Sequence, residues 1–323
     1  MTAPVLRPAL LCATALAAAL LALPLIGSAP LDLAKALAGD PVHSTILHLR
    51  LSRVLLAALS GGALAVAGLL FQALVRDSLA DPYTLGVSSG SSLGAVISIF
   101  FRLEAYRGVA ALAGAVAVLS LNLALASRGR RLSSLTLLLA GVTVNSVAIA
   151  VVLLFHSLAD YGQSFQMMRW LMGGIESPDY ATLALLAAVL LPVVGFVYAR
   201  SRDWNLLAVG DTWAESHGVA STPALRNGFL AGSVLTAAVT CLTGPIGFLG
   251  WMVPHALRLW LGADLRTLIP SAFLAGACFL AVCDTVARTA LAPTEIPIGA
   301  ITAILAGPFF LWLLGKRSRG LWL

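Results

Sequence analysis

The sequence predicts an all-α integral membrane protein that crosses the bilayer about ten times, and three observations lead to this prediction. Hydrophobic residues make up 59% of the chain, charged residues make up only 11%, and the mean hydropathy is +0.95. A soluble domain carries about twice that charged fraction, so this chain has too few polar groups for a surface that faces water. The apolar residues also fall into runs of about the length that a spanning helix needs. A single transmembrane domain over residues 1–323 accounts for all of these runs.

Ten apolar segments follow one another along the chain. They are Ala9–Ile26, Val54–Val75, Gly90–Phe101, Val109–Ala126, Leu135–Phe155, Leu183–Ala199, Leu225–Leu242, Ile246–Leu261, Ala272–Leu291 and Ile298–Leu314. The third and eighth segments are short or interrupted. Backbone that does not span as a helix is stable at membrane depth only where protein or water surrounds it. These two segments therefore indicate a pathway through the protein.

The first segment has some features of a cleavable signal, because an apolar run is followed by the small residues Gly27-Ser28-Ala29. The run is about 18 residues long, however, which exceeds the usual apolar core of a signal peptide. We expect the segment to remain as the first span.

The basic residues predict the orientation. With ten spans and both termini in the cytoplasm, thirteen of the 20 basic residues lie on the cytoplasmic side and seven on the outer side. Cytoplasmic loops carry the excess of arginine and lysine in membrane proteins. Because the basic residues are scattered between apolar runs or gathered at their ends, the net charge of +6 does not indicate a nucleic-acid partner.

Several kinds of chemistry have no support in the sequence. The four cysteines, at positions 12, 241, 278 and 283, lie within apolar segments and lack the spacing of metal ligands, so we expect no metal site. The only two lysines are Lys35 and Lys316, and neither belongs to a phosphate-binding loop. If ATP drives this protein, another chain must bind it.

Small residues recur at four-residue intervals in the second segment, at Ala57, Gly61 and Ala65 and again at Ala58 and Gly62. This spacing lets helix backbones approach closely in lipid. It predicts a tightly packed bundle.

Residues 201–222 form the longest polar interruption on the predicted cytoplasmic side. Gly210, Ala214 and Gly218 recur there every four residues. The spacing predicts short helices with one face of small residues that fits a groove in a partner, and a solvated loop is the alternative.

The segment from Gly244 to Arg258 combines three glycines and two prolines within an apolar run. Proline removes a helical hydrogen bond and clashes with the preceding turn, so a continuous straight helix is not expected here. His255 lies one turn before Arg258, and we interpret it as a structural hydrogen-bonding residue rather than a ligand or proton carrier.

Ten motifs follow in a fixed order. They are Arg50-Leu-Ser-Arg53, Gln72-Ala-Leu-Val-Arg-Asp-Ser-Leu-Ala-Asp-Pro82, Leu85-Gly-Val-Ser-Ser-Gly90, Leu138-Leu-Ala-Gly141, Trp170-Leu-Met-Gly-Gly174, Gly244-Pro-Ile-Gly-Phe-Leu-Gly250, Pro254-His255, Asp284-Thr-Val-Ala-Arg288, Glu295-Ile-Pro-Ile-Gly299 and Gly307-Pro-Phe-Phe-Leu-Trp312. In this order and spacing the chain resembles the FecCD-type permeases, the type II ABC importers of cobalamin, haem and iron–siderophore complexes. One departure is Ser52, where the family usually has proline.

The resemblance implies the type II importer fold, with ten helices in each subunit of a homodimer in the bacterial inner membrane. It implies two cytoplasmic ATP-binding subunits and a periplasmic substrate-binding protein as partners. The chain itself is then no enzyme and binds no cofactor covalently, since the partner subunits use the ATP. Residues 201–222 become the cytoplasmic coupling loop that contacts the ATPase, with Gly210, Ala214 and Gly218 as its contact residues.

The resemblance also implies roles for individual residues. Arg50, Arg53 and Arg288 match positions that bind two glutamates of the delivering protein, and the alternative for Arg288 is an ion pair with Asp284 one turn earlier. Two serines, Ser133 and Ser134, match the cytoplasmic gate.

The sequence gives few indications of which residues line the substrate path. Met167 and Met168 offer soft contacts to a large flat ligand, or they are packing residues. Asn145 and His156 on the fifth apolar segment are candidates for polar groups that line the path. The sequence does not name the cargo, although Trp170-Leu-Met-Gly-Gly174 slightly favours cobalamin.

Two alternatives of other classes remain open. An ion-gradient-driven secondary transporter would use buried acids and broken helices at the membrane midplane, and Asp284 and the break near Pro254 are its only support. A membrane enzyme or scaffold is the other alternative, but no catalytic constellation falls on one segment.

Overall fold

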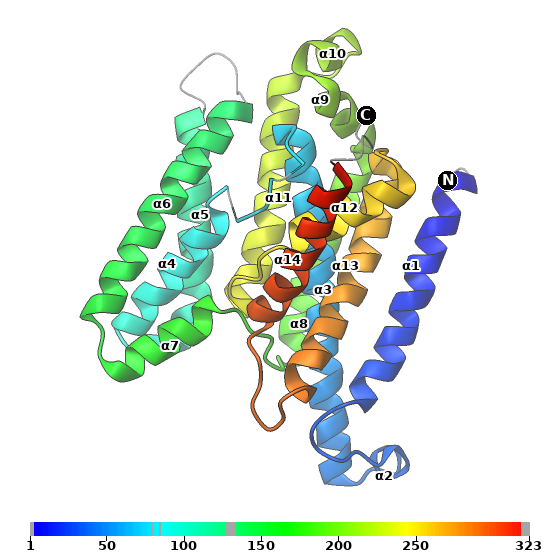
Figure 1. Cartoon of the computed structure of the whole chain (residues 1–323). Coiled ribbons are helices and arrows are strands. Elements are labelled where there is room, and N and C mark those ends of the chain that lie inside the picture. The colour runs from blue at the N-terminus through cyan, green and yellow to red at the C-terminus, as the bar shows by residue number, and fades with distance from the viewer. Residues whose placement is uncertain (1–2, 79, 84, 127–133, 318–323) are drawn as a thin grey trace.

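The computed structural model describes residues 3–78, 80–83, 85–126 and 134–317 (Figure 1). Within these ranges the chain forms fourteen α-helices and two short 3-10 helices. Their bounds are α1 (Ala3–Ala22), η1 (Leu23–Leu25), α2 (Leu33–Leu37), α3 (Pro41–Val75), α4 (Val87–Phe100), η2 (Glu104–Tyr106), α5 (Arg107–Ala126), α6 (Ser134–Leu158), α7 (Tyr161–Leu171), α8 (Tyr180–Ala199), α9 (Ser201–Val209), α10 (Asp211–Ser216), α11 (Ser221–Thr243), α12 (Leu249–Leu261), α13 (Leu265–Thr289) and α14 (Ile298–Arg317).

All ten predicted apolar segments are helical for most of their length. Among the described residues, seven helices are long and apolar enough to cross a membrane, namely α1, α3, α5, α6, α8, α11 and α13. Helices α4 and α14 are shorter apolar helices, and α12, with 13 residues, takes the place of the eighth segment. The prediction of an all-α membrane protein with about ten apolar helices is confirmed.

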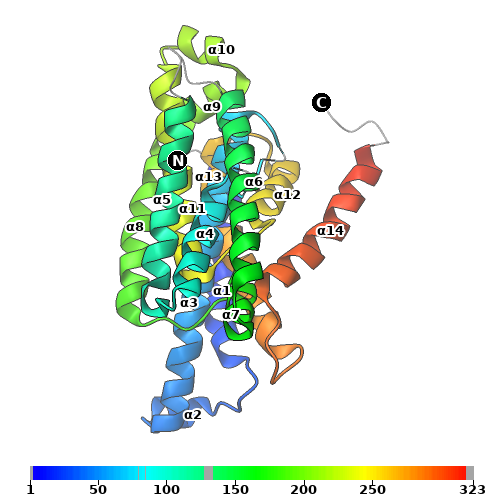
Figure 2. The same ribbon diagram turned by 90° about the vertical axis from the view of Figure 1, so that its left-hand side faces the viewer.

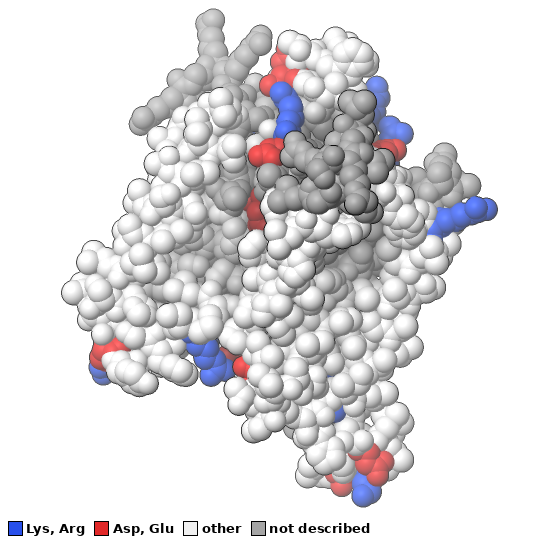
Figure 3. Space-filling view, in the orientation of Figure 1, with Lys and Arg blue, Asp and Glu red and all other residues white. Residues whose placement is uncertain are grey.

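The charged residues mark two opposite ends of the molecule. In the space-filling view the Lys, Arg, Asp and Glu side chains gather at the top and bottom, and the body between them is almost uncharged (Figure 3). Helices α9 and α10 lie at one end and α2 at the other (Figure 1). We call these the α10 end and the α2 end. Helix α1 begins, and α14 finishes, toward the α10 end.

Helix α3 occupies the centre of the bundle, and glycines let its neighbours approach closely. A Cβ atom added at Gly61 would overlap the carbonyl oxygen of Gly276 on α13, and one added at Gly68 would overlap that of Gly250 on α12. The close packing predicted from the small-residue spacing of this segment is therefore confirmed. Helix α14, in contrast, leaves the bundle at an angle (Figure 2).

Helix α3 begins well before the predicted Val54. The carboxylate of Asp40 accepts hydrogen bonds from the backbone nitrogens of Val42 and His43, both at 3.0 Å, and Pro41 occupies the first helical position. Aspartate before proline is a strong helix start. The resulting 35 residues extend over about 52 Å, well beyond the apolar core of a bilayer.

The short helices expected in residues 201–222 are present, but the spacing of small residues was interpreted wrongly. Gly210 separates α9 from α10, Ala214 is buried inside the protein, and Gly218 follows α10 with a φ of +84°. The three residues do not form one helix face, because α10 is only six residues long.

Side chains fix α9 to the end of α8, and both α9 and α10 to the residue that follows α3. The indole nitrogen of the buried Trp204 donates to the carbonyl oxygen of Val197 at 2.9 Å. The guanidinium of Arg76, just after α3, donates to the carbonyl oxygen of Leu207 at 2.9 Å and pairs with Asp211.

Candidate functional site

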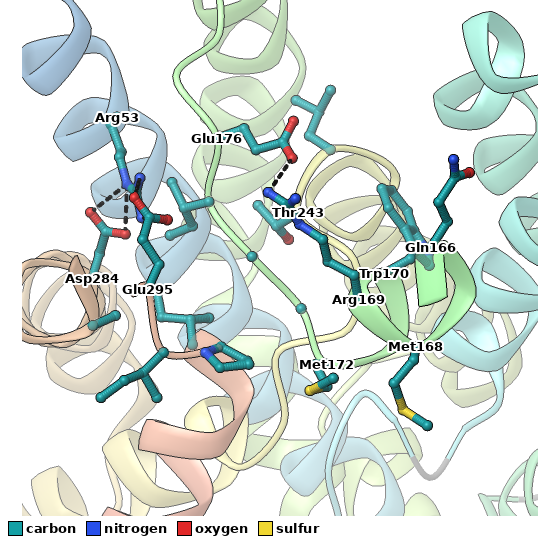
Figure 4. Close-up of a pocket in the computed structure, with 18 of the residues that line it drawn as sticks. Arg53, Gln166, Met168, Arg169, Trp170, Met172, Glu176, Thr243, Asp284 and Glu295 are labelled. Carbon is teal, nitrogen blue, oxygen red and sulfur yellow. Dashed lines mark hydrogen bonds and ion pairs between the residues drawn. The ribbon is translucent and has the colours of Figure 1, made fainter. Parts of the chain in front are cut away.

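A cavity of about 660 Å³ lies among elements in the half of the bundle nearer α2 (Figure 1 and Figure 4). Its walls come from α3, the η2–α5 turn, α7 with the chain that follows it, the end of α11, α13 and the start of α14. The lining residues are Arg53, Glu104, Arg107, Phe165, Gln166, Met168, Arg169, Trp170, Met172, Gly173, Gly174, Ile175, Glu176, Leu242, Thr243, Asp284, Ala287, Glu295, Ile296, Pro297 and Ile298.

Arg53 forms the centre of a charged cluster on one wall of this cavity. Its Nε atom donates to the two carboxylate oxygens of Asp284 at 3.0 and 3.2 Å. Its Nη1 and Nη2 atoms donate to the two carboxylate oxygens of Glu295 at 2.9 and 3.1 Å. This bidentate geometry joins α3 to the connection between α13 and α14 (Figure 4).

The other two predicted docking arginines are buried in this structure. Arg50 donates to the carbonyl oxygens of Leu25 at 3.4 Å and Ala29 at 2.5 Å. Arg288 donates to the carbonyl oxygen of Leu23 at 2.8 Å. Both guanidinium groups therefore hold the chain that connects α1 to α2.

The ion pair considered as an alternative for Arg288 is present, because its Nε atom lies 3.7 Å from Asp284 Oδ2. Asp284 is wholly buried, and its carboxylate lies between the guanidinium groups of Arg53 and Arg288. Of the three arginines, only Arg53 lines the cavity.

The opposite wall combines aromatic, sulfur and charged side chains. The guanidinium of Arg107 lies 4.9 Å from the ring centre of Trp170, a cation–π contact. Arg169 lies 3.7 Å from Glu176. Met168 and Met172 line the cavity, whereas Met167 is fully buried in a cluster with residues of α4 and α6. The two interpretations of the methionines therefore apply to different residues: Met167 is a packing residue, and Met168 faces the cavity.

Three segments that are far apart in the sequence meet at the wall of this cavity. The backbone nitrogen of Gly174 donates to the carbonyl oxygen of Thr243 at 2.8 Å, and that of Gly299 donates to the carbonyl oxygen of Met172 at 3.2 Å. A Cβ atom added at Gly173, which has a φ of +69°, would overlap the carbonyl oxygen of Pro245. Three of the sequence motifs thus form one junction of closely packed backbone, which sequence reasoning missed.

The remaining predicted site residues lie elsewhere. Asn145 and His156 are partly buried on α6 and do not line the cavity. The backbone of Ser134 begins α6, while its side chain and the whole of Ser133 lie outside the described residues.

Helix α7 is fixed at its start by a capping box. The Asp160 carboxylate accepts from the backbone nitrogen of Gln163 at 2.8 Å, and the Gln163 side chain accepts from the backbone nitrogen of Asp160 at 3.1 Å. Arg102 donates to Asp160 at 3.1 Å. The backbone hydrogen bond from Gln163, helped by Arg102, lowers the pKa of Asp160. The signal was readable in the sequence as aspartate followed three residues later by glutamine.

The fold has a close counterpart among solved structures. It superposes with a TM-score of 0.88 on a metal-chelate type ABC transporter in an inward-facing conformation, at 27% identity, covering 96% of this chain and 99% of that one. The class is therefore the multi-pass permease of an ABC transporter, which is distinct from the ATPase. This class excludes the secondary transporter that the sequence left open.

Two relatives and a family match agree with this class. The haemin transport permease HmuU of Yersinia pestis is 39% identical over 287 residues, 87% of this chain and 86% of that protein. The vitamin B12 permease BtuC of Escherichia coli is 38% identical over 282 residues, 85% of this chain and 84% of that protein. Residues 11–316 match the FecCD transport family, and the chain belongs to this family.

Proposed function

We propose that two copies of this chain form the transmembrane pathway of an importer for a metal chelate, either haem, cobalamin or an iron–siderophore complex. The observation that carries the proposal is the cavity in the half of the bundle nearer α2, whose walls combine Trp170, Phe165, Met168 and Met172 with charged groups. Apolar and sulfur-containing walls suit a large, flat, amphipathic ligand. Relatives that import haemin and vitamin B12 favour the same class of cargo.

In this proposal the α2 end faces the periplasm and receives the substrate-binding protein. Arg53 lies at the cavity wall, where an acidic partner reaches it. Arg50 and Arg288 have to exchange backbone carbonyl partners for carboxylates of the docking protein. Charged groups of this kind govern the rate and register of association more than its affinity.

The α10 end then faces the cytoplasm, as do both termini, and residues 201–222 contact the ATPase subunits. Val209 and Trp213 are the large apolar side chains exposed there. Gly210 separates α9 from α10, Gly218 with its φ of +84° allows the turn after α10, and the buried Ala214 lets α10 lie close to the bundle. Ser133 and Ser134 complete the proposal as the cytoplasmic gate.

Reconstitution tests the function directly. The permease, its ATPase and its substrate-binding protein are placed in proteoliposomes, and uptake of haem, cobalamin and a ferric siderophore is measured with and without ATP. We expect ATP-dependent uptake of one of them. Uptake that ignores ATP, or that requires a proton gradient, contradicts the proposal.

A variant tests the assignment of residues 201–222. We expect Gly218→Leu to leave ATP hydrolysis running while uptake falls at least about tenfold, because a positive φ strains any side chain there. Gly195→Leu is the control, since Gly195 on α8 also has open space around it. Equal uptake by the two variants contradicts the coupling role.

A further inference from the structure

Arg53 has two acidic partners, and they lie in very different surroundings. Asp284 is wholly buried on α13 and holds the Nε side of the guanidinium. The Glu295 side chain is 54% exposed on the connection before α14 and holds the outer fork, Nη1 and Nη2. A buried ion pair is costly to break, whereas an exposed one contributes little, about 0.2–1 kcal/mol. The contact of Arg53 Nε with Asp284 is therefore fixed, whereas Nη1 and Nη2 can exchange Glu295 for another carboxylate.

We propose that Glu295 is an internal competitor for the site on Arg53 that a carboxylate of an acidic protein partner takes during docking. The proposal rests on the function proposed above. A glutamate of the partner offers the same two oxygens to the same two nitrogens, so the exchange loses no ion pair. Asp284 keeps the guanidinium in place throughout, because it binds a different nitrogen.

The exchange acts on the wall of the cavity. Glu295 belongs to the short connection after α13, where the backbone nitrogen of Ile296 donates to the carbonyl oxygen of Ala287 at 3.0 Å. Residues 295–298 line the cavity and lead directly into α14. When Glu295 leaves Arg53, this connection loses its side-chain link to α3. Docking of an acidic group therefore loosens the cavity wall at the start of α14.

A charged peptide probes the exchange without the natural partner. The transporter is placed in nanodiscs, and binding of fluorescent hexaglutamate is measured by anisotropy at low salt. We expect Glu295→Gln to bind about two- to fivefold tighter than the wild type, because the competing charge is gone. The matched control is Glu104→Gln, which removes a charge from the same cavity but not from Arg53. In an Arg53→Gln background, the gain from Glu295→Gln should vanish.

A spin label tests the loosening. It is attached to Leu291→Cys, an exposed position on the same connection, in a background where the four native cysteines are alanine. We expect higher label mobility in Glu295→Gln, and in the wild type with saturating hexaglutamate, but not in Glu104→Gln.

Equal binding by Glu295→Gln and Glu104→Gln, or persistence of the gain without Arg53, overturns the inference and leaves the proposed function intact. Unchanged label mobility in Glu295→Gln also overturns it. Conversely, a gain confined to Glu295→Gln in a transporter that moves no metal chelate supports the inference and contradicts the proposed function.

Discussion

Helices α3 and α6 have almost the same hydropathy but opposite environments. Their best windows have mean hydropathies of 2.3 and 2.5, yet 89% of the α3 window and only 22% of the α6 window is buried inside the subunit. Moving an apolar side chain from lipid into the protein interior changes its free energy little, because lipid tails are equally apolar. The fit between helices therefore decides which helix is central. Helix α3 carries glycines where α12 and α13 approach, whereas α6 exposes large side chains such as Leu139 and Leu153. Small residues, rather than hydropathy, mark the core.

The largest expected effect comes from filling the closest approach on α3. Gly68→Leu forces a side chain onto the backbone of Gly250, and we expect loss of folded protein, more than about 4 kcal/mol. The measurement is the monodisperse fraction after extraction in mild detergent. Gly195→Leu on α8 is the control, since nothing lies within 4 Å of its added Cβ atom. A normal yield for Gly68→Leu would contradict the packing role of α3.

Removing charge from the interface of α3 with α13 should cost nearly as much. Asp284→Asn leaves Arg288 buried without its ion pair and Arg53 with Glu295 alone, so we expect a loss of about 3 kcal/mol. Glu176→Gln, which breaks an exposed pair with Arg169, should cost less than about 1 kcal/mol. Equilibrium unfolding in mixed micelles gives the free energy of unfolding of the two variants. Equal losses would show that burial does not determine how much an ion pair contributes to stability.

A pair of identical substitutions tests the comparison most directly. Leu64 on α3 is fully buried, whereas Leu153 on α6 is 62% exposed. We expect Leu64→Ala to destabilise the subunit by about 2 kcal/mol, the low end of the usual range, because lipid replaces water as the alternative environment. Leu153→Ala should change the same unfolding midpoint by less than about 0.5 kcal/mol. Similar losses would place α6 in the packed core.

The smallest expected effect concerns the short peripheral helix α7. The pKa of Asp160 is lowered in the folded state, so its contribution is complete above the unfolded pKa of an aspartate and is lost as the pH falls through the lowered value. We expect Asp160→Ala to lower the thermal midpoint slightly at pH 7 and by less at low pH, where the carboxyl is neutral and only its oxygen still caps the helix. Asp160→Asn keeps a capping oxygen and should lose less. A loss in Asp160→Ala that is equally large at pH 7 and at low pH would contradict the role of the charge.

The sequence predicts the helices better than their arrangement. All ten apolar segments are helical for most of their length. Long apolar runs indicate a lipid environment, and a chain that crosses lipid has to form its backbone hydrogen bonds internally, as a helix does. The early start of α3 was missed, although Asp40-Pro41 signals it, because the first turns after it are too polar to count as a span. Gly210 and Gly218 were assigned to one helix face, since spacing alone does not show that α10 ends before Gly218.

The candidate site was predicted only in part, because its residues meet through tertiary packing. Arg53 was singled out, but its partner Glu295 lies on a different connection that no local pattern joins to it. Met167 and Met168 are adjacent in sequence and point to different faces of α7, so their roles depend on where α4 and α6 lie. The junction of Gly173 with Pro245 likewise follows from close backbone packing, which spacing along the chain does not encode.

The length of α3 has a mechanical consequence. Arg53 lies in the first half of α3 and Arg76 directly follows its last residue, Val75, so the two are about 35 Å apart at 1.5 Å per residue. No proline interrupts it after Pro41, and proline is a common cause of sharp kinks. Because α3 is continuous between these points, we expect a displacement along its axis at the Asp284 contact to be passed on toward the Asp211 contact. One helix thus connects the Arg53–Asp284 ion pair to the Arg76–Asp211 ion pair.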